Sequence, residues 1–225
     1  MAVIDLPCEI MRPRDASFFL RWTTRSAGRR LSDGQEQITS PGYAVWEVEY
    51  SLGLEFNQTR IKQFEAAISS LRGRSNTARI CVCDPFRYGA KVSPAQQPWS
   101  DGTWFTDGTG FLGAPGVQAM ATTQPAVAGD TAIWLALTNP VRPALRIGDM
   151  FSVNDFLYRV TAVGANGFHR IEPPIRTPFP VGTTIQTDPP MVRVRLATDD
   201  QGRRGREFLR WGQPVTVSFV EAFER

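Results

Sequence analysis

The sequence predicts a mainly β fold, in which a β-sandwich with one flanking helix is accompanied by an inserted small β-barrel. Several stretches alternate between apolar and polar residues, as half-buried strands do, and only one segment has helical spacing. The 17 prolines and 19 glycines suit many short strands joined by turns. A chain of 225 residues can bury one sizeable core or two small ones.

The first strands are predicted from two alternating stretches. In "SFFLRWTT", one face carries Phe18, Leu20 and Trp22. In "GYAVWEVEYSL", the residues of the apolar face are Ala44, Trp46, Val48, Tyr50 and Leu52. The polar stretch between them, "RSAGRRLSDGQEQ", indicates the turn of a long hairpin.

The one predicted helix runs from Asn57 to Leu71. Its apolar residues recur at the three- and four-residue spacing of a helix that has one face toward a sheet, and they are Ile61, Phe64, Ala67, Ile68 and Leu71. Asn57 is expected to cap the N-terminus, and Gly73 is expected to end the helix.

Short strands resume after a long irregular stretch, at "TAIWLALT", "DMFSV", "FLYRVTAV", "FHRIE" and "PVGTTIQT". Asn154-Asp155 and Asn166-Gly167 stand where tight hairpin turns are needed. This spacing predicts a small barrel. Two last strands, "MVRVRLA" and "PVTVSFVEAF", cannot form a core alone and are expected to return to the first sheet.

The predicted organisation is therefore a sandwich domain from residues 1–88 and 189–225, an irregular Gly/Pro/Trp-rich loop at 89–124, and an inserted barrel at 125–188.

The composition excludes several classes of protein. A hydrophobic share of 42% with 21% charged residues argues against wholesale disorder, and a net charge of +3 is too small to indicate nucleic-acid binding. We expect no secretory signal and no membrane span. Three cysteines favour folding in a reducing compartment without disulfides.

The stretch "FEAAISSLRGRSNTARICVCDP" raises the possibility of a phosphate loop followed by a thiolate pair. Helix N-termini favour anions, but this glycine follows the C-terminal end of the helix, and the Lys-Ser/Thr of a P-loop is absent. We therefore interpret the stretch as the joint between a helix and a strand.

Cys81 and Cys83 point to one face of a predicted strand, and a zinc site would need further ligands from the distant Cys8 or His169. Core positions are the preferred interpretation. His169 lies in a predicted strand without a triad signature around it, which favours a structural role. Asp101 and Asp107 lack the further oxygen ligands of a calcium loop, and a flexible loop that contacts a partner is favoured. No catalytic residue, metal site or cofactor is expected.

Two basic runs, "RSAGRR" and "QGRRGREFLR", are predicted hairpin tips. They are either solvated or paired with carboxylates of a neighbouring subunit, since arginine forms bidentate pairs. Together with the arginines that follow the helix, the candidate interface residues are Arg29, Arg30, Arg72, Arg74, Arg203, Arg204 and Arg206.

The sequence resembles the tail-tip proteins of long-tailed, non-contractile phages and prophages, and among these the distal-tail-like proteins. The resemblance covers most of the chain and is carried by "SPGYAVWEVEYSL", the helix that ends in "LRGR", the "DP" exit, "RIGDMFSVNDFLYRVTAVGANGFHRIEPPIR" and "MVRVRLATDD…VSFVEAF". The loop from Pro98 to Gly116 has no counterpart in it.

The resemblance implies a tail-tube-like sandwich that assembles into a ring, with a small barrel facing outward. It implies a structural, non-enzymatic protein of the virion that is assembled in the host cytoplasm. The implied partners are other copies, with a hexamer favoured and a trimer open, and the tail tube, hub and fibre proteins. No membrane or specific nucleic-acid partner is expected.

The sequence raises two other possible functions. A carbohydrate-binding module that contacts the host surface is suggested by Trp99, Trp104 and Phe105 in the irregular loop, and by Trp134 beside it. Alternatively, these aromatic side chains fill a hydrophobic core or a subunit interface. A wall hydrolase is not supported, because no recognisable catalytic carboxylate pair is present.

Overall fold

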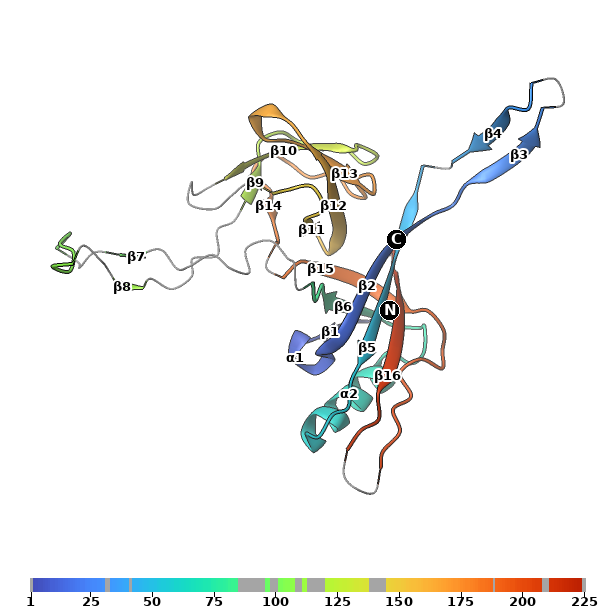
Figure 1. Cartoon of the computed structure of the whole chain (residues 1–225), viewed down its shortest axis with the longest axis vertical. Coiled ribbons are helices and arrows are strands. Elements are labelled where there is room, and N and C mark those ends of the chain that lie inside the picture. The colour runs from blue at the N-terminus through green and yellow to red at the C-terminus, as the bar shows by residue number, and fades with distance from the viewer. Residues whose placement is uncertain are drawn as a thin grey trace.

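The computed structural model describes residues 2–30, 33–40, 42–84, 96–97, 101–107, 111–112, 120–137, 145–187, 189–207 and 211–223. Within these ranges the protein is mainly β, as predicted, with a sandwich, a flanking helix and a nearly closed small barrel (Figure 1).

The main sheet has six strands, which come from both parts of the chain that flank the barrel. In spatial order they are β1 (Val3–Leu6), β6 (Thr77–Cys81), β15 (Met191–Leu196), β16 (Val215–Glu221), β5 (Ala44–Leu52) and β2 (Pro13–Trp22). The two halves of this sheet run crosswise in Figure 1. The Tyr50 hydroxyl on β5 donates to the Cys81 carbonyl on β6 at 2.6 Å, so the sheet folds over on itself into a sandwich.

The core of the sandwich follows the predicted alternation. Trp46, Val48 and Tyr50 on β5 are fully buried. On β2, Phe18 and Leu20 pack against the core, whereas Trp22 at the end of the strand is 40% exposed. The last two strands do return to this sheet, since β15 pairs with β6 and β16 pairs with β5.

Helix α2 (Gln58–Ser70) flanks the sheet and buries Phe64 and the following Leu71 in its core. The predicted cap is confirmed: the Asn57 side chain accepts hydrogen bonds from the backbone N–H groups of Thr59 and Arg60. Gly73, with a φ of +63°, follows the helix end as predicted. A four-residue helix, α1 (Cys8–Met11), was not predicted.

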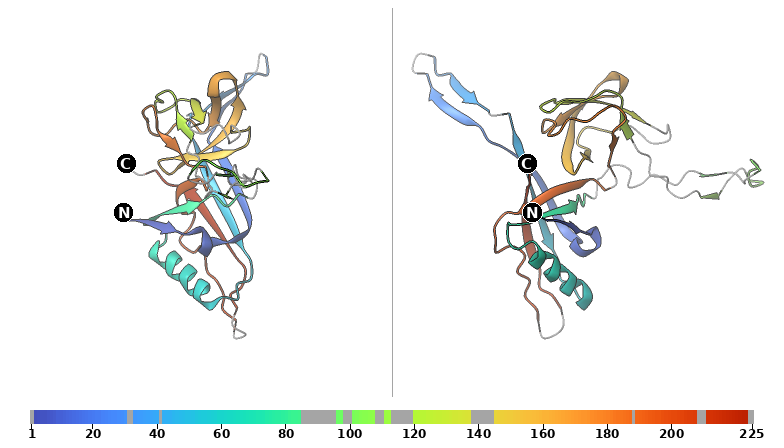
Figure 2. Two further views of the ribbon diagram at one scale, coloured as in Figure 1. Left: turned by 90° about the vertical axis from the view of Figure 1, so that its left-hand side faces the viewer. Right: turned by 180° about the vertical axis from the view of Figure 1, so that it is seen from behind.

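A two-stranded hairpin, β3 (Arg25–Arg29) and β4 (Glu36–Thr39), extends from the ends of β2 and β5 away from the rest of the chain (Figures 1 and 2). Every residue of both strands is exposed. The Ser26 hydroxyl on β3 donates a hydrogen bond to the Glu36 carboxylate on β4 at 2.6 Å.

The second sheet forms the barrel. In spatial order its strands are β11 (Met150–Val153), β12 (Phe156–Val163), β13 (Phe168–Glu172), β10 (Ala132–Leu137), β9 (Met120–Thr122) and β14 (Thr184–Ile185). The residue after β14 bridges back to β11, because Ser152 and Gln186 exchange backbone hydrogen bonds at 2.8 and 2.9 Å. β9 places residues 120–122 in the barrel sheet, ahead of the boundary at 125 that the sequence suggested.

Both predicted barrel turns are present. Asn154 and Asp155 have positive φ angles of 51° and 64° and form the two-residue turn between β11 and β12. Asn166 and Gly167, within the short turn η1 (Ala165–Gly167), have φ angles of 56° and 76° and lead into β13.

Two further short strands, β7 (Gln96–Gln97) and β8 (Phe111–Leu112), pair with each other. With residues 101–107 they lie well away from both sheets, as Figure 1 and the right-hand view of Figure 2 show. We call these described residues the β7–β8 arm.

Candidate functional site

The barrel and the sandwich are joined by a buried polar junction. The Trp46 indole N–H donates to the Leu157 carbonyl on β12 at 2.7 Å, and Leu157 itself belongs to the core of the sandwich. Arg159 lies 5.0 Å from the centre of the Trp46 ring and donates to the Phe18 carbonyl at 3.3 Å. The barrel is therefore held to the sandwich by both apolar packing and hydrogen bonds.

A buried ion pair completes this junction. Arg176, which follows β13, pairs at 3.0 Å with Glu221 on β16 and also donates to the Ala44 carbonyl. Glu221 accepts in addition from the Trp46 backbone N–H at 3.1 Å. Burial raises the pKa of the Glu221 carboxyl, although Arg176 and the Trp46 N–H act in the opposite direction.

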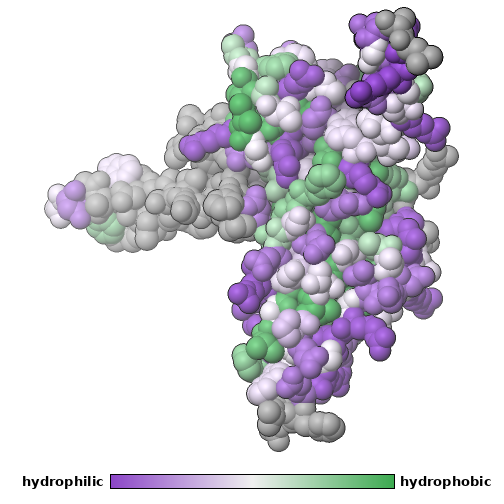
Figure 3. Space-filling view, turned by 45° about the vertical axis from the view of Figure 1, so that its right-hand side comes forward, coloured by the Kyte–Doolittle hydropathy of each residue, from purple (hydrophilic) through white to green (hydrophobic). Residues whose placement is uncertain are grey.

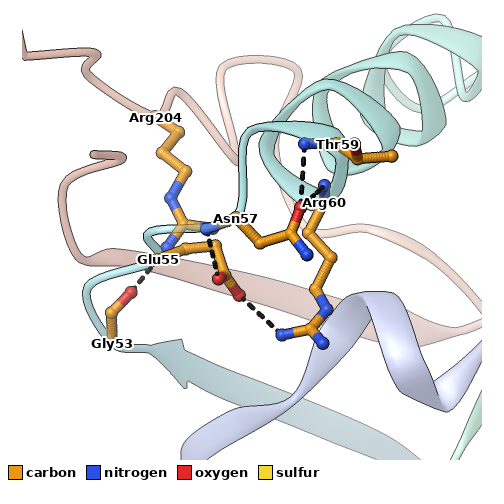
Figure 4. A network of polar contacts seen from close by, with 6 residues as sticks. All are labelled: Gly53, Glu55, Asn57, Thr59, Arg60 and Arg204. Carbon is orange, nitrogen blue, oxygen red and sulfur yellow. Dashed lines mark hydrogen bonds and ion pairs between the residues drawn. The ribbon is translucent and has the colours of Figure 1, made fainter. Parts of the chain in front are cut away.

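Among the candidate interface arginines, Arg204 binds groups of its own chain. It belongs to the connection between β15 and β16 (residues 197–214), lies 5.7 Å from the centre of the Phe64 ring, and donates to the Gly53 and Gln213 carbonyls. Figure 4 shows it beside the network that starts α2, in which Glu55 accepts from the Asn57 backbone N–H and from Arg60. Arg204 thus fixes the connection against the helix.

Arg206 also has a partner in its own chain, since it forms an ion pair with Glu65 on α2. This hydrogen-bonded pair lowers the pKa of the Glu65 carboxyl. The Arg206 side chain nevertheless remains 60% exposed, so its outer surface is accessible to a partner.

Arg72, Arg74 and Arg203 are exposed near the C-terminal end of α2. The backbone N–H of Arg74 donates at 2.9 Å to the Asp199 carboxylate, which belongs to the β15–β16 connection. A carboxylate of the chain itself thus occupies the turn that raised the possibility of a phosphate loop, which agrees with its interpretation as a joint.

The structure gathers five of the candidate arginines beside α2 and leaves the other two elsewhere. Arg29 and Arg30 are exposed in the β3–β4 hairpin, at the opposite end of the molecule from the β15–β16 connection (Figure 1). On the space-filling surface, the described part of this hairpin is predominantly hydrophilic (Figure 3).

A groove of about 150 Å³ lies between α2 and the β15–β16 connection, and we call it the α2 groove. Its lining residues are Gln58, Ile61, Lys62, Arg206, Glu207 and Trp211. At its edge, the ring of Phe56 is 67% exposed and meets the Trp211 ring edge-on at 6.1 Å between centres. Sequence reasoning missed Phe56 and Trp211, because each stands outside the strand and helix patterns.

Of the aromatic residues proposed to contact a host or partner, Trp104 and Phe105 lie in the β7–β8 arm and are 50% and 37% exposed. Trp99 lies outside the described residues. Trp134 is instead half-buried on β10, where its ring meets Phe168 edge-on at 5.5 Å.

The expectation that the cysteines remain reduced is wrong for two of them, because Cys8 and Cys81 form a disulfide. The parallel pairing of β1 with β6 brings Cys8, just after β1, beside the end of β6, although 73 residues separate the two cysteines. The sulfur of Cys83 lies 3.5 Å from that of Cys81.

His169 is 1% exposed, and its Nδ1 bonds to the Gly167 carbonyl at 2.8 Å. This placement suits the structural role that the sequence favoured. Within the described parts of the chain, no group of three or more His, Cys, Asp or Glu side chains is arranged to hold a metal ion.

Comparison with known proteins adds no identification. No family model matches the sequence, and no curated protein matches it significantly. Among the helices that the structure describes, none combines the length and apolar character needed to span a membrane.

Proposed function

We propose that this chain is a structural subunit of a phage tail tip, forming a distal tail ring that joins the tail tube to hub or fibre proteins. It acts by assembly and catalyses no reaction. A closed ring of identical copies is expected, with six preferred by the sequence resemblance and three as the alternative. The observation that carries this proposal is the β3–β4 hairpin, which extends from the sandwich with every strand residue exposed.

An isolated two-stranded hairpin is marginally stable in water. This one contains Ile38, whose side chain is 62% exposed, and the exposed Arg29 and Arg30. Such a segment is expected to gain its order from a neighbouring molecule. A second copy in a ring would supply that surface at every subunit.

The edges of the main sheet support the same proposal. Its last strand, β2, is ten residues long, and its first, β1, has four. Exposed strand edges invite pairing with other chains, and closure into a symmetric ring removes them. The buried Arg176–Glu221 junction would then transmit load between the ring and the barrel that faces other tail proteins.

The proposal is tested by locating the protein in intact virions, with cryo-electron microscopy of the tail and a labelled antibody. Density for this fold in a ring on the tail axis is expected. Purified protein at high concentration should also form rings in negative stain. A variant in which residues 25–39 are replaced by an Asn-Gly turn should fold but lose the rings. Labelling of the virion away from the tail axis would overturn the proposal.

A second candidate function is carbohydrate binding, and the exposure of Trp104 and Phe105 on the β7–β8 arm favours it. Sugar rings stack on accessible aromatic faces. Binding to a panel of host surface glycans that is lost in Trp104→Ala and retained in Trp22→Ala would support it. A wild-type protein that binds none of them would exclude it.

A further inference from the structure

The tip of the β7–β8 arm has an acidic and aromatic surface. Residues 101–107 read DGTWFTD and contain two aspartates and no Lys or Arg. All seven residues are exposed, including Trp104. Asp101 accepts hydrogen bonds from the backbone N–H and the hydroxyl of Thr103, which lower the pKa of its carboxyl, so it is charged at neutral pH. The tip therefore presents negative charge next to accessible rings.

The α2 groove contains a cation that could pair with such a surface. Its lining contains two cations, Lys62 and Arg206, and one anion, Glu207. Arg206 is already paired with Glu65, and Glu207 accepts from Gln213 at 3.1 Å. Lys62 is exposed and has no ion pair with another described residue. A carboxylate that entered the groove would therefore meet an available ammonium group.

The apolar part of the groove also matches the arm. Ile61 and Trp211 line the groove, and the exposed ring of Phe56 stands beside Trp211. Aromatic rings with an adjacent cation are typical of the energetic centre of a protein interface. Two accessible aromatic side chains from a partner would extend this ring cluster with the edge-on contacts that such rings prefer.

In this structure the arm does not lie in the groove of its own chain. The described residues of the arm extend away from both sheets, and α2 with the β15–β16 connection lies at a different end of the molecule (Figures 1 and 2). An occupant from another molecule is therefore favoured, and a second copy of this chain carries the matching surface.

We propose that residues 101–107 of one copy dock in the α2 groove of a second copy, with Trp104 against Phe56 and Trp211 and the Asp101 carboxylate facing Lys62. This inference rests on the proposed function, because it supplies a contact between subunits of the assembly. It also gives a role to the arm and to the aromatic residues beside α2, which the ring alone does not explain.

The first test is photo-cross-linking of the full-length protein with p-benzoylphenylalanine in place of Trp104. A mixture of ¹⁵N-labelled and unlabelled chains separates intermolecular from intramolecular products by mass. We expect mixed-isotope products that link position 104 to the tryptic peptides 31–60 or 211–225, which contain Phe56 and Trp211. The same photoreactive residue at Val127, a 63% exposed barrel position, should not label these peptides. The absence of intermolecular products, or their mapping to other peptides, would overturn the docking.

The second test is a charge exchange, read as the association constant from sedimentation velocity. Lys62→Glu and Asp101→Lys should each weaken association about tenfold, and the double variant should recover most of the loss. Asp101→Asn keeps an acceptor for Thr103 but removes the charge, so it should also weaken association. Arg170→Glu on the barrel is the matched charge control and should have no effect. Single variants that associate like wild type, or a double variant without recovery, would overturn the docking.

The outcomes for the docking and for the ring are distinguishable. Rings that form equally well from wild type and Lys62→Glu, without a cross-link from position 104, would refute the docking and leave the proposed function standing. A specific cross-link in a protein that is absent from the tail axis of virions would support the docking and refute the proposed function.

Discussion

The indole N–H of Trp46 donates to the carbonyl of Leu157 at 2.7 Å, so a fully buried ring of the sandwich is bonded to the backbone of the barrel. The two residues lie 111 positions apart in the sequence. This bond and the Arg176–Glu221 pair together fix the orientation of the barrel relative to the sandwich.

Trp46→Phe should destabilise the protein by about 1–3 kcal/mol, because the phenyl ring fills much of the site but leaves the Leu157 carbonyl without its donor. Urea unfolding followed by far-UV circular dichroism measures the change. Trp22→Phe, at a 40% exposed position on the neighbouring strand, should change stability by less than about 0.5 kcal/mol. Equal effects of the two substitutions would contradict the role of the bond.

Glu221 should make stability depend on pH in a direction opposite to that of most carboxylates. Burial raises the pKa of its carboxyl above the ordinary 4.5, so between 4.5 and the folded pKa the folded state holds a proton that the unfolded state has lost. The contribution of Glu221 to the free energy of unfolding is therefore greatest below pH 4.5 and is lost as pH rises through the folded pKa.

Glu221→Gln removes this titration and keeps an acceptor for the Trp46 N–H. The unfolding free energy of the wild type, minus that of the variant, should fall as pH rises above 4.5 and then level off. Urea titrations at a series of pH values measure both proteins. Parallel profiles would show that the Glu221 pKa is the same in the folded and unfolded states.

Arg206→Ala should raise the pKa of Glu65 toward its ordinary 4.5, because the hydrogen bond from Arg206 is the main cause of the lowering. In the wild type this pair stabilises the fold above pH 4.5, and the contribution disappears as pH falls through the folded pKa. Carbon-detected NMR of the carboxyl group gives the titration directly. Arg203→Ala, at an exposed neighbouring arginine, should leave the Glu65 titration unchanged.

Gly167→Ala should destabilise the barrel by more than about 2 kcal/mol. A Cβ at this position would lie 2.1 Å from the Leu135 carbonyl oxygen, and the φ of +76° disfavours an L side chain. Gly182→Ala, at a similar φ of +82° but in open space, separates the backbone strain from the clash. Thermal unfolding should show a clearly larger loss for Gly167→Ala, and equal losses would exclude the close contact as its cause.

The sequence alone predicts those parts of the structure that depend on residues adjacent in the chain. The alternation around Trp46 and Tyr50, the Asn57 cap and the Asn154-Asp155 turn each depend on a few adjacent side chains or on one pair of backbone angles. All three are present as predicted. The mainly β fold with an inserted barrel followed from such local signals.

The contacts that bring distant strands together were not predictable in this way. Nothing near Cys8 indicates that it meets Cys81, since this depends on a parallel pairing of β1 with β6. Likewise, the sequence marked Arg204 and Arg206 as hairpin-tip residues that face solvent or a neighbouring subunit, whereas both have partners beside α2 in their own chain. Pairing partners far apart in sequence are set by the tertiary arrangement of the sheet.

The chain leaves the sandwich after β6 and returns in β15, and these two strands are hydrogen-bonded neighbours, with Val82 N–H donating to the Pro190 carbonyl at 2.8 Å. The segment between β6 and β15, which includes the barrel, is thus connected to the sandwich at two adjacent positions of the backbone. An inserted segment of this kind can be exchanged by recombination while β6 and β15 keep their hydrogen-bonding register in the main sheet. Related proteins could therefore differ in this inserted segment and keep the same sandwich, provided that each replacement still covers Trp46.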